Sequence, residues 1–479
     1  MAMRRSVSQK EQPPERETAA AAKGPDLSGL SACIRDAKQV ALATDTGPAE
    51  PTDYADLRRR LVTAEERLPP LYRDQVSTPF RAALDRLGKK GFASLLSRDP
   101  EREGEACLML DIAQAILQNG ERYEDRATDG FQEVVSDLYD GFLSAEDRKE
   151  VKPPDKGVIP PLVKWGYPEA GPYTWPVDAT SSFGVAAAIV NLPPANARAG
   201  ILAWAAIAHE TSGHDIIHAD SGLAEEMAGK VWEALTKAKL GKILPDYWSA
   251  RIDETASDVL GILNMGPAAG IGLVGYFRAL RAAWGGDPVL SGTGHLSDPH
   301  PADLLRAYLA AAVVRRLSFS GAAKWAAAIE KEADRDLTTI RLGTTVIPSR
   351  DAKQSADIVA EILARTKMEQ LELRALGHIQ DWRDKDERIA GKLRTLLRQS
   401  GTLPTRYAKG IYAAHVVAAA VTTSVAKGAD LPLIFHRMLG ILKVMHDRNP
   451  SWGPLYVAHP GNLSAVFPLT LPENIPDWE

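Results

Sequence analysis

Residues 201–220 read ILAWAAIAHETSGHDIIHAD, a segment in which an apolar run leads into a group of histidines and acidic residues. Its first half is an alanine-rich apolar run that begins shortly after Asn196, which predicts a buried helix. Its second half places ionisable side chains in this apolar setting, namely His209, Glu210, His214, Asp215, His218 and Asp220. Burying such groups costs free energy unless they are paired or bind a metal. Because imidazoles and carboxylates are ligands of zinc, the segment predicts a metal site.

The spacing of the first two histidines is unusual for a metal-binding helix. In an H-E-x-x-H motif the two histidines lie about 40° apart around a regular helix, so that both reach one metal. His209 and His214 are instead separated by one further residue, which gives about 140° in a regular helix. Because Gly213 directly precedes His214, we expect a π-type distortion at this point to bring the two rings together.

Two alternatives to this ligand pair remain open. His214 and His218 form an H-D-x-x-H motif with Glu210 one turn earlier on the same face, and this register could bind the metal instead. The segment could also bind no metal, with its ionisable groups paired to one another. If His209 and His214 are the ligands, we expect His218 beside them as a supporting residue or in the core.

Residues 253–261, DETASDVLG, supply what the first register lacks. Glu254 and Asp258 lie four residues apart on one helix face, in a segment that is apolar at its other positions. Glu254 can provide a third metal ligand, and Asp258 can accept a hydrogen bond from a ligating imidazole. Three protein ligands leave zinc an open position, which is typical of catalytic sites.

Together, the two segments resemble the glutamate-zincin (gluzincin) metallopeptidases. AHETSGH with the following DIIHADSGL is similar to the zinc-binding helix of that family, and ETASDVLG is similar to its thermolysin-type E-x-x-S-D helix. The additional residue makes the first motif H-E-x-x-G-H, a form found in dipeptidyl-peptidase III-like enzymes. The resemblance implies that His209, His214 and Glu254 hold one Zn²⁺ per chain, with Glu210 as general base and Asp258 as the partner of a ligand.

A hydrolytic site also needs donors for a developing oxyanion. Residues 292–306 form a predicted loop that enters a helix, and they offer His295, His300 and Arg306. We favour His300 as the catalytic donor, although it could equally serve only to cap that helix. Two tyrosines could donate instead but are more typical of a core, Tyr276 and Tyr308.

Residues 183–192, FGVAAAIVNL, predict a strand just upstream of the histidine-bearing helix. Gluzincin peptidases place an edge strand here that pairs with an extended peptide substrate. We therefore expect residues 186–192 to form such an edge and Asn191 to add a substrate-binding hydrogen bond. An ordinary buried strand is the alternative.

The expected fold class is mainly α, a helical metallopeptidase core with a small β-sheet beside the active-site helix. We expect four regions along the chain: a disordered tail (1–26), a helical amino-terminal region (27–150), the catalytic core (151–320), and a helical carboxy-terminal region with an extended tail (321–479). Residues 259–277 carry no charge and reach the length of a membrane span, but Asn264, Pro267 and several glycines favour a helix, a break and a second helix.

Composition and charge limit the possible partners. The formal net charge of −5, from 57 basic and 62 acidic residues, does not favour binding to nucleic acid. The only cysteines, Cys33 and Cys107, cannot form a cysteine-rich zinc site and are typical of a reducing compartment. Because the first residues lack an apolar signal segment, we expect a cytoplasmic protein that does not bind membranes.

The leading functional hypothesis is a zinc-dependent metallopeptidase that acts on a peptide or protein substrate. One alternative is a non-catalytic helical protein that uses zinc for stability or for binding a partner. A second alternative is a metal-dependent phosphohydrolase built on His214 and Asp215, although no histidine precedes His209 to complete such a site.

Overall fold

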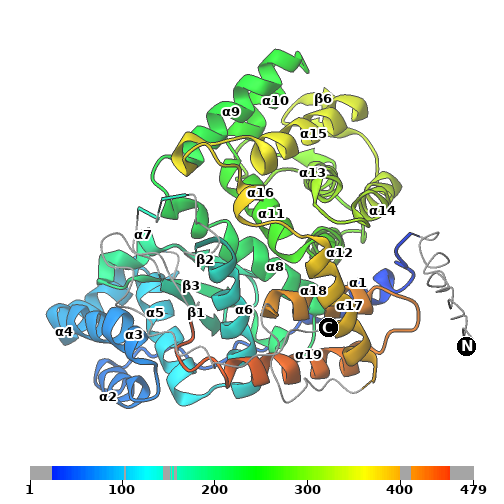
Figure 1. Ribbon diagram of the computed structural model, residues 1–479. Coiled ribbons are helices and arrows are strands. Elements are labelled where there is room, and N and C mark those ends of the chain that lie inside the picture. Colours follow the sequence, from blue (N-terminus) through cyan, green and yellow to red (C-terminus); the bar gives the residue numbers. More distant parts are fainter. Residues whose placement is uncertain are drawn as a thin grey trace, which may run out of the picture.

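The computed structural model describes residues 24–101, 104–143, 151–152, 154–155, 159–399 and 411–453. Helices dominate these residues, and the strands form two small three-stranded sheets (Figure 1). The expected fold class, mainly α with a small sheet beside the histidine-bearing helix, is confirmed. The expected disordered tail up to residue 23 and the expected extended tail from residue 454 lie outside the described residues.

The elements of the amino-terminal half are α1 (Leu30–Ala41), α2 (Tyr54–Glu65), α3 (Pro70–Tyr72), η2 (Arg73–Ser77), α4 (Thr78–Arg98), α5 (Glu105–Glu121), α6 (Asp125–Leu143), β1 (Ile159–Trp165), β2 (Tyr173–Trp175), α7 (Val177–Thr180), η3 (Ser181–Phe183), β3 (Ala187–Leu192), η4 (Pro194–Ala197), α8 (Ile201–Ser212), η5 (Ile216–Ala219) and α9 (Leu223–Ala238). The remaining elements are α10 (Ile243–Ser249), α11 (Ile252–Met265), α12 (Pro267–Ala283), β4 (Thr293–Gly294), α13 (Asp303–Arg316), α14 (Ala322–Arg335), β5 (Ile340–Leu342), β6 (Thr345–Ile347), α15 (Ser349–Arg365), η6 (Glu369–Leu371), α16 (Leu376–Ile379), α17 (Asp384–Gln399), α18 (Ala413–Ser424) and α19 (Leu431–His446).

The first sheet has the strand order β1-β3-β2, with β1 parallel and β2 antiparallel to β3. The expectation that residues 186–192 form an edge strand is therefore wrong, because β3 lies in the centre. Its side chains are buried on both faces, which suits a central strand. Pro160 and Pro161 cannot donate to a sheet, and they lie in β1 at one edge. The other edge, β2, packs against α8.

Helices α11 and α12 are separated at Gly266, as the glycine- and proline-containing segment predicts. Gly266 has a φ of 59°, and a Cβ at this position would lie only 2.5 Å from the Trp382 ring. Arg251 leaves the helical conformation between α10 and α11, so that α11 with Glu254 and Asp258 begins as a separate helix. In the described ranges, no helix combines the length and the apolar character needed to cross a membrane.

The larger core joins elements that are far apart in the sequence. It contains side chains of α6, α8, α11, α12, α13, α18 and α19, and it draws on all three regions expected after the tail. Helix α18 is buried along its whole length, as its alanine and valine content predicts. A smaller core lies between α2, α4 and α5 and one face of the β1-β3 pair. Because α8 and α11 lie in the larger core, their charged residues are carried into the interior.

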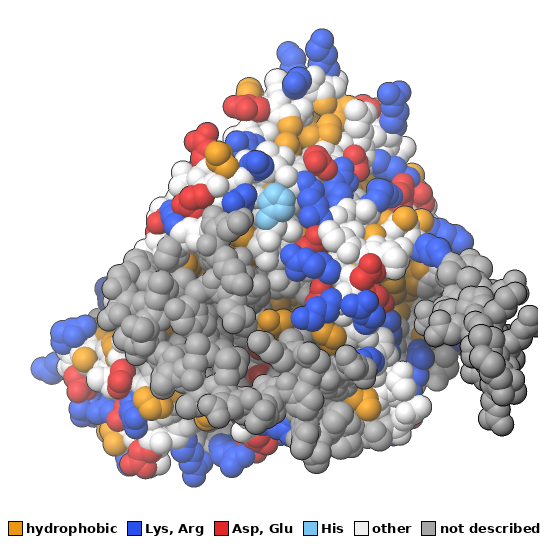
Figure 2. Space-filling model, viewed as in Figure 1, with side chains coloured by type: hydrophobic (Ala, Val, Ile, Leu, Met, Phe, Trp, Pro, Cys, Tyr) orange, Lys and Arg blue, Asp and Glu red, His pale blue; other side chains and the backbone are white. Residues whose placement is uncertain are grey.

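Figure 2 shows one face of the molecule, on which many charged side chains of the described residues are visible. Basic and acidic side chains are interspersed there. This mixture agrees with the nearly balanced charge of the whole chain.

Candidate metal centre

Helix α8 ends between His209 and His214. It runs to Ser212, and His214 lies in the turn that follows. The expected π-type distortion is therefore wrong, because termination of the helix frees His214 from the angle that a regular helix would impose. Gly213 is needed there, since a Cβ on it would lie 1.6 Å from the Ser257 Oγ of α11. The close approach of α11 therefore leaves no room for a side chain at the residue where α8 ends.

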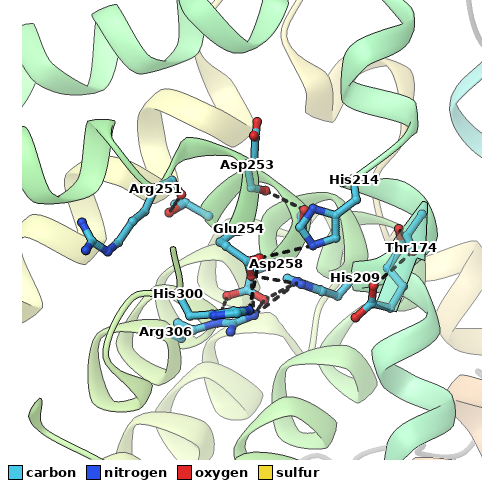
Figure 3. A network of polar contacts seen from close by, with 12 residues as sticks. Thr174, His209, His214, Arg251, Asp253, Glu254, Asp258, His300 and Arg306 are labelled. Carbon is cyan, nitrogen blue, oxygen red and sulfur yellow. Dashed lines mark hydrogen bonds and ion pairs between the residues drawn. The ribbon is translucent and has the colours of Figure 1, made fainter. Parts of the chain in front are cut away.

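His209, His214 and Glu254 converge at the junction of α8 and α11 (Figure 3). One ligand atom from each of the three lies within 4.8 Å of the others, so the group could hold a metal ion. The Nε2 atoms of His209 and His214 lie 3.3 Å and 3.4 Å from the two carboxylate oxygens of Glu254. The imidazole rings are 5.0 Å apart and nearly perpendicular. We call these three residues the metal centre.

Asp258 and Arg306 support the metal centre from behind. Asp258 Oδ1 lies 2.9 Å from His209 Nδ1, which leaves Nε2 of that ring directed at Glu254. Arg306 of α13 donates to both carboxylate oxygens of Asp258, each at 2.8 Å. The sequence predicted Asp258 as the partner of a ligand, and the structure places it there. Arg306, considered as an oxyanion donor, is instead committed to Asp258.

The charges of this group are strongly coupled. Burial opposes a charge on His209, but the Asp258 and Glu254 carboxylates outweigh burial and raise the pKa of His209 to about 10. Burial and the neighbouring His209 lower the pKa of His214. Burial would raise the pKa of both carboxyl groups, yet His209 beside Glu254 and Arg306 beside Asp258 hold those pKa values below their usual range. Both carboxylates are therefore anionic.

The donor set fits a divalent cation on two grounds. Glu254 Oε2 is buried, and His209 Nε2 at 3.3 Å and Arg306 Nη2 at 3.6 Å pair with it as charges without forming a hydrogen bond to it. The buried groups Glu210, Glu254, Asp258 and Arg306 together carry a net charge of −2 with neutral imidazoles, and protonation of His209, which its raised pKa favours, still leaves −1. A buried acceptor without a hydrogen bond and an excess of buried negative charge are both costly. A cation bound between the imidazoles and Glu254 would relieve both costs.

His300 lies at the open side of the metal centre. Its Nε2 is 3.3 Å from Glu254 Oε1, its Nδ1 is 3.0 Å from Asp298 Oδ1, and its side chain is 54% exposed. The alternative that His300 caps the next helix is wrong, because α13 begins at Asp303 and has no side-chain cap. The loop is held in place by Arg251, which donates to the carbonyl oxygens of His295 and Leu296. In Figure 3 the Arg251 side chain points away from the metal centre.

Glu210 follows His209 on α8, and its side chain is almost buried. Thr174 of β2 places its hydroxyl 3.1 Å from Glu210 Oε2 and 3.2 Å from the Glu210 carbonyl oxygen. The charge on Glu210 also adds to the effect of burial in raising the pKa of Tyr276, so these two groups lie within electrostatic range. The other tyrosine considered, Tyr308, donates instead to Asp334 on α14.

Two predicted residues have other surroundings. Asn191 is fully buried, and its amide donates to the carbonyl oxygens of Gly166 and Gly171, so the expected contact with a substrate is wrong. His218 lies in η5 with its Nε2 3.4 Å from Asp253 Oδ1, near the ligands but outside the group that could hold a metal.

Thr174 and Asp253 were not singled out from the sequence. Because Asp253 directly precedes Glu254, the sequence alone could have indicated that it lies near the site. Its pairing with His218 depends on how η5 packs against α11, which the sequence does not indicate. Thr174 lies in a proline-rich segment without a motif, and only the three-dimensional structure brings it to Glu210. Comparison of the chain with protein-family models, with curated proteins and with solved structures gives no match.

Proposed function

We propose that this protein is a zinc-dependent metallopeptidase of the gluzincin type, which cleaves peptide bonds with Glu210 as general base. The observation that carries the proposal is the convergence of two imidazoles and a carboxylate whose buried Oε2 accepts no hydrogen bond. Glu210 directly follows one of these residues in the chain. His209, His214 and Glu254 would hold the zinc ion. Three protein ligands leave an open position, which is characteristic of catalytic rather than structural zinc.

Each nearby group has a defined role in this proposal. A zinc ion would supply a Lewis acid toward a water molecule and a substrate carbonyl. Glu210 accepts a proton from the attacking water and passes it to the leaving amine. His300, exposed at the open side, donates a hydrogen bond to the developing oxyanion. Asp258 holds the His209 ring in the orientation that leaves Nε2 toward the centre.

Two features of the chain support a peptidase over the alternatives. The H-E-x-x-G-H and E-x-x-S-D segments resemble those of gluzincins, and they lie in contact in the fold, as that resemblance implies. A phosphohydrolase would need Asp215 at the metal, but Asp215 lies outside the group of described residues whose ligand atoms converge. A purely structural zinc site would need a fourth protein ligand, and the cluster found in the described ranges has three.

The test combines metal analysis with peptide hydrolysis. Purified protein loaded with ZnCl₂ and dialysed is expected to retain one zinc per chain and to cleave a fluorogenic peptide library. His209→Ala should lose the zinc. Glu210→Gln should keep it and lose about 10²- to 10⁴-fold in turnover, because only the base is removed. His378→Ala, an exposed histidine outside the site, is the control.

Each other result has a definite meaning. Zinc bound without hydrolysis of any peptide, and with Glu210→Gln behaving like the wild type, would favour a non-catalytic zinc protein. Release of phosphate from p-nitrophenyl phosphate would favour the phosphohydrolase. Zinc-free protein that folds normally and is not stabilised by added ZnCl₂ would overturn the metal centre itself.

A further inference from the structure

Strand β2 presents its two faces to different charged groups. Side chains alternate along a strand, so Tyr173 and Trp175 point to one face and Thr174 to the other. Tyr173 and Trp175 both donate to Asp111 of α5, whereas Thr174 contacts Glu210 of α8. A single three-residue strand therefore connects the proposed general base with a carboxylate on a different helix.

Asp111 belongs to a second buried ionic cluster, outside the metal centre. Lys164 of β1 donates to Asp111 Oδ1 at 2.7 Å and to the Tyr173 hydroxyl at 3.1 Å. The Tyr173 hydroxyl donates in turn to Asp111 Oδ2 at 2.6 Å, and Trp175 Nε1 donates to the same oxygen at 2.8 Å. We call these four residues the Asp111–Lys164 cluster. Both carboxylate oxygens of Asp111 and the ammonium group of Lys164 therefore have hydrogen-bond partners.

The two charged side chains of this cluster are fully buried. The side chains of Asp111 and Lys164 are both 0% exposed. Burial lowers the pKa of Lys164 even though Asp111 opposes that shift. Replacing a buried ion pair by apolar residues is often neutral or stabilising, so stability alone is weak grounds for such a pair. Buried pairs of this kind are better suited to fixing one arrangement of the elements that supply their partners.

Strand β2 needs such an anchor. It has three residues, and it pairs on one side only, with Ile189, Val190 and Asn191 of β3. Short edge strands have little intrinsic stability. The donors Tyr173 and Trp175 fasten the strand to Asp111, and Asp215 fastens the turn beyond it by accepting from the Val177 backbone. Asp215 itself directly follows the metal-centre residue His214.

We propose that the Asp111–Lys164 cluster is a positioning device for catalysis: it locks β2 so that the Thr174 hydroxyl holds the Glu210 carboxylate in its working orientation. This inference rests on the proposed function, because it assigns the cluster to the general base. Thr174, Tyr173 and Asp111 are positioning residues, since they act through Glu210 and contact no reacting atom.

The Thr174 hydroxyl is well placed for this task. It lies near both the carboxylate and the carbonyl oxygen of Glu210. That carbonyl belongs to the last turn of α8, where carbonyl oxygens lack partners within the helix. The single hydroxyl proton is shared between these two acceptors of the same residue, and it restrains the carboxylate when it is donated to Oε2. Without it, Glu210 can turn among several rotamers, and only part of the population is oriented for proton transfer.

The experiment compares two matched tyrosines. In Tyr173 the hydroxyl bonds to an aspartate and the ring lies 5.5 Å from Lys164 Nζ. In Tyr308 the hydroxyl bonds to Asp334 and the ring lies 5.1 Å from Lys353 Nζ, but these contacts join α13 to α14 and α15 and do not involve β2. We expect Tyr173→Phe to lower kcat about tenfold with little change in KM and in zinc content. Tyr308→Phe should leave all three unchanged.

Variants of Thr174 test whether the effect passes through the hydroxyl. Thr174→Val should lower kcat about tenfold or more, and Thr174→Ser, which keeps the donor, should recover most of that loss. The double variant Tyr173→Phe/Thr174→Val should be no slower than Thr174→Val alone, because both changes remove the same restraint. Hydrogen exchange of the zinc-free protein should show faster exchange in β2 for Tyr173→Phe and not for Tyr308→Phe.

Failure of this inference is distinct from failure of the proposed function. An active zinc enzyme in which Tyr173→Phe matches Tyr308→Phe, or in which the losses at Tyr173 and Thr174 multiply, would overturn the positioning role alone. The absence of zinc binding and peptide hydrolysis in the wild-type protein would overturn the function, and the exchange measurement would then still report whether Asp111 restrains β2.

Discussion

The metal centre and the Asp111–Lys164 cluster lie on opposite sides of β2, and both bury charge, but only one is complete. In the Asp111–Lys164 cluster one positive charge meets one negative charge at zero exposure, and each has its partners. The metal centre with its neighbours carries excess negative charge, leaves Glu254 Oε2 without a hydrogen bond and exposes 23% of His214. A buried cluster whose charges are balanced stabilises one arrangement of the surrounding elements. A cluster with excess negative charge that solvent can reach is able to bind a cation.

The largest effect is expected where the balanced cluster is broken. Lys164→Met leaves the Asp111 carboxylate buried without its counter-charge, and removal of one partner of a buried pair costs about 3–5 kcal/mol. Urea unfolding of the zinc-free protein measures this loss in the free energy of unfolding. Removing both charges in Lys164→Met/Asp111→Leu should recover much of it, because no uncompensated charge remains.

An exposed ion pair provides the control for this prediction. Arg58 and Asp85 lie in contact, with about half of each side chain exposed. Exposed pairs contribute little, so Arg58→Met should leave the free energy of unfolding nearly unchanged. If Lys164→Met were as mild as Arg58→Met, the Asp111–Lys164 cluster would not be the closed unit described.

The second prediction concerns the unbalanced cluster. Zinc that binds only the folded protein should raise the free energy of unfolding by about 2.7 kcal/mol at a concentration of 100 times Kd. The measurement compares unfolding in ZnCl₂ with unfolding in EDTA. His214→Ala removes a partly exposed ligand and should abolish the increment while the metal-free stability changes little. Equal stabilisation of His214→Ala and wild type by zinc would place the cation elsewhere.

Much of the metal centre could be predicted from the sequence, because its signal is local. The ionisable residues of 209–220 stand out in an apolar helix, and Glu254 and Asp258 share one face at helical spacing. The structure brings His209, His214 and Glu254 together as that pattern predicts. The mainly helical fold could be predicted for the same reason, because the spacing of apolar residues within each segment indicates a helix.

The remaining features depend on contacts between distant segments. Asp111 and Lys164 each stand as the single charge in an apolar run, which indicates that each has a partner but not which one. The strand order could not be predicted from β3 alone, because a buried apolar strand can be a central or an edge strand depending on which strands pair with it. The close approach of Ser257 of α11 to Gly213, at the end of α8, joins segments about 40 residues apart, and no local pattern predicts it.

A third, smaller effect tests that approach. Gly213→Ala adds a Cβ that would lie 1.6 Å from Ser257 Oγ and 2.3 Å from Ser257 Cα, so the two helices must separate. Overpacking of this kind costs about 1–3 kcal/mol. It should also weaken zinc binding, because α8 and α11 carry different ligands. Equilibrium unfolding and zinc titration measure the two effects.

Gly229 of α9 is the matched control for Gly213. No atom lies within 4 Å of a Cβ built on Gly229, and α9 carries none of the metal-centre residues. Gly229→Ala should stabilise the protein by up to about 1 kcal/mol, the difference in helix propensity. A Gly213→Ala variant that is as stable and as zinc-competent as Gly229→Ala would show that α8 does not need its close contact with α11.

The smallest effect is expected at His218, and it separates the two registers of the histidine segment. His218 pairs with Asp253, and both side chains are partly exposed, so His218→Ala should alter stability and zinc affinity only slightly. If His214 and His218 were the ligand pair, the same variant would lose zinc as completely as His209→Ala. Competition with a chromogenic chelator measures the affinities of both variants. Because His218 lies outside the group whose ligand atoms converge, we expect His209→Ala to lose the metal and His218→Ala to retain it.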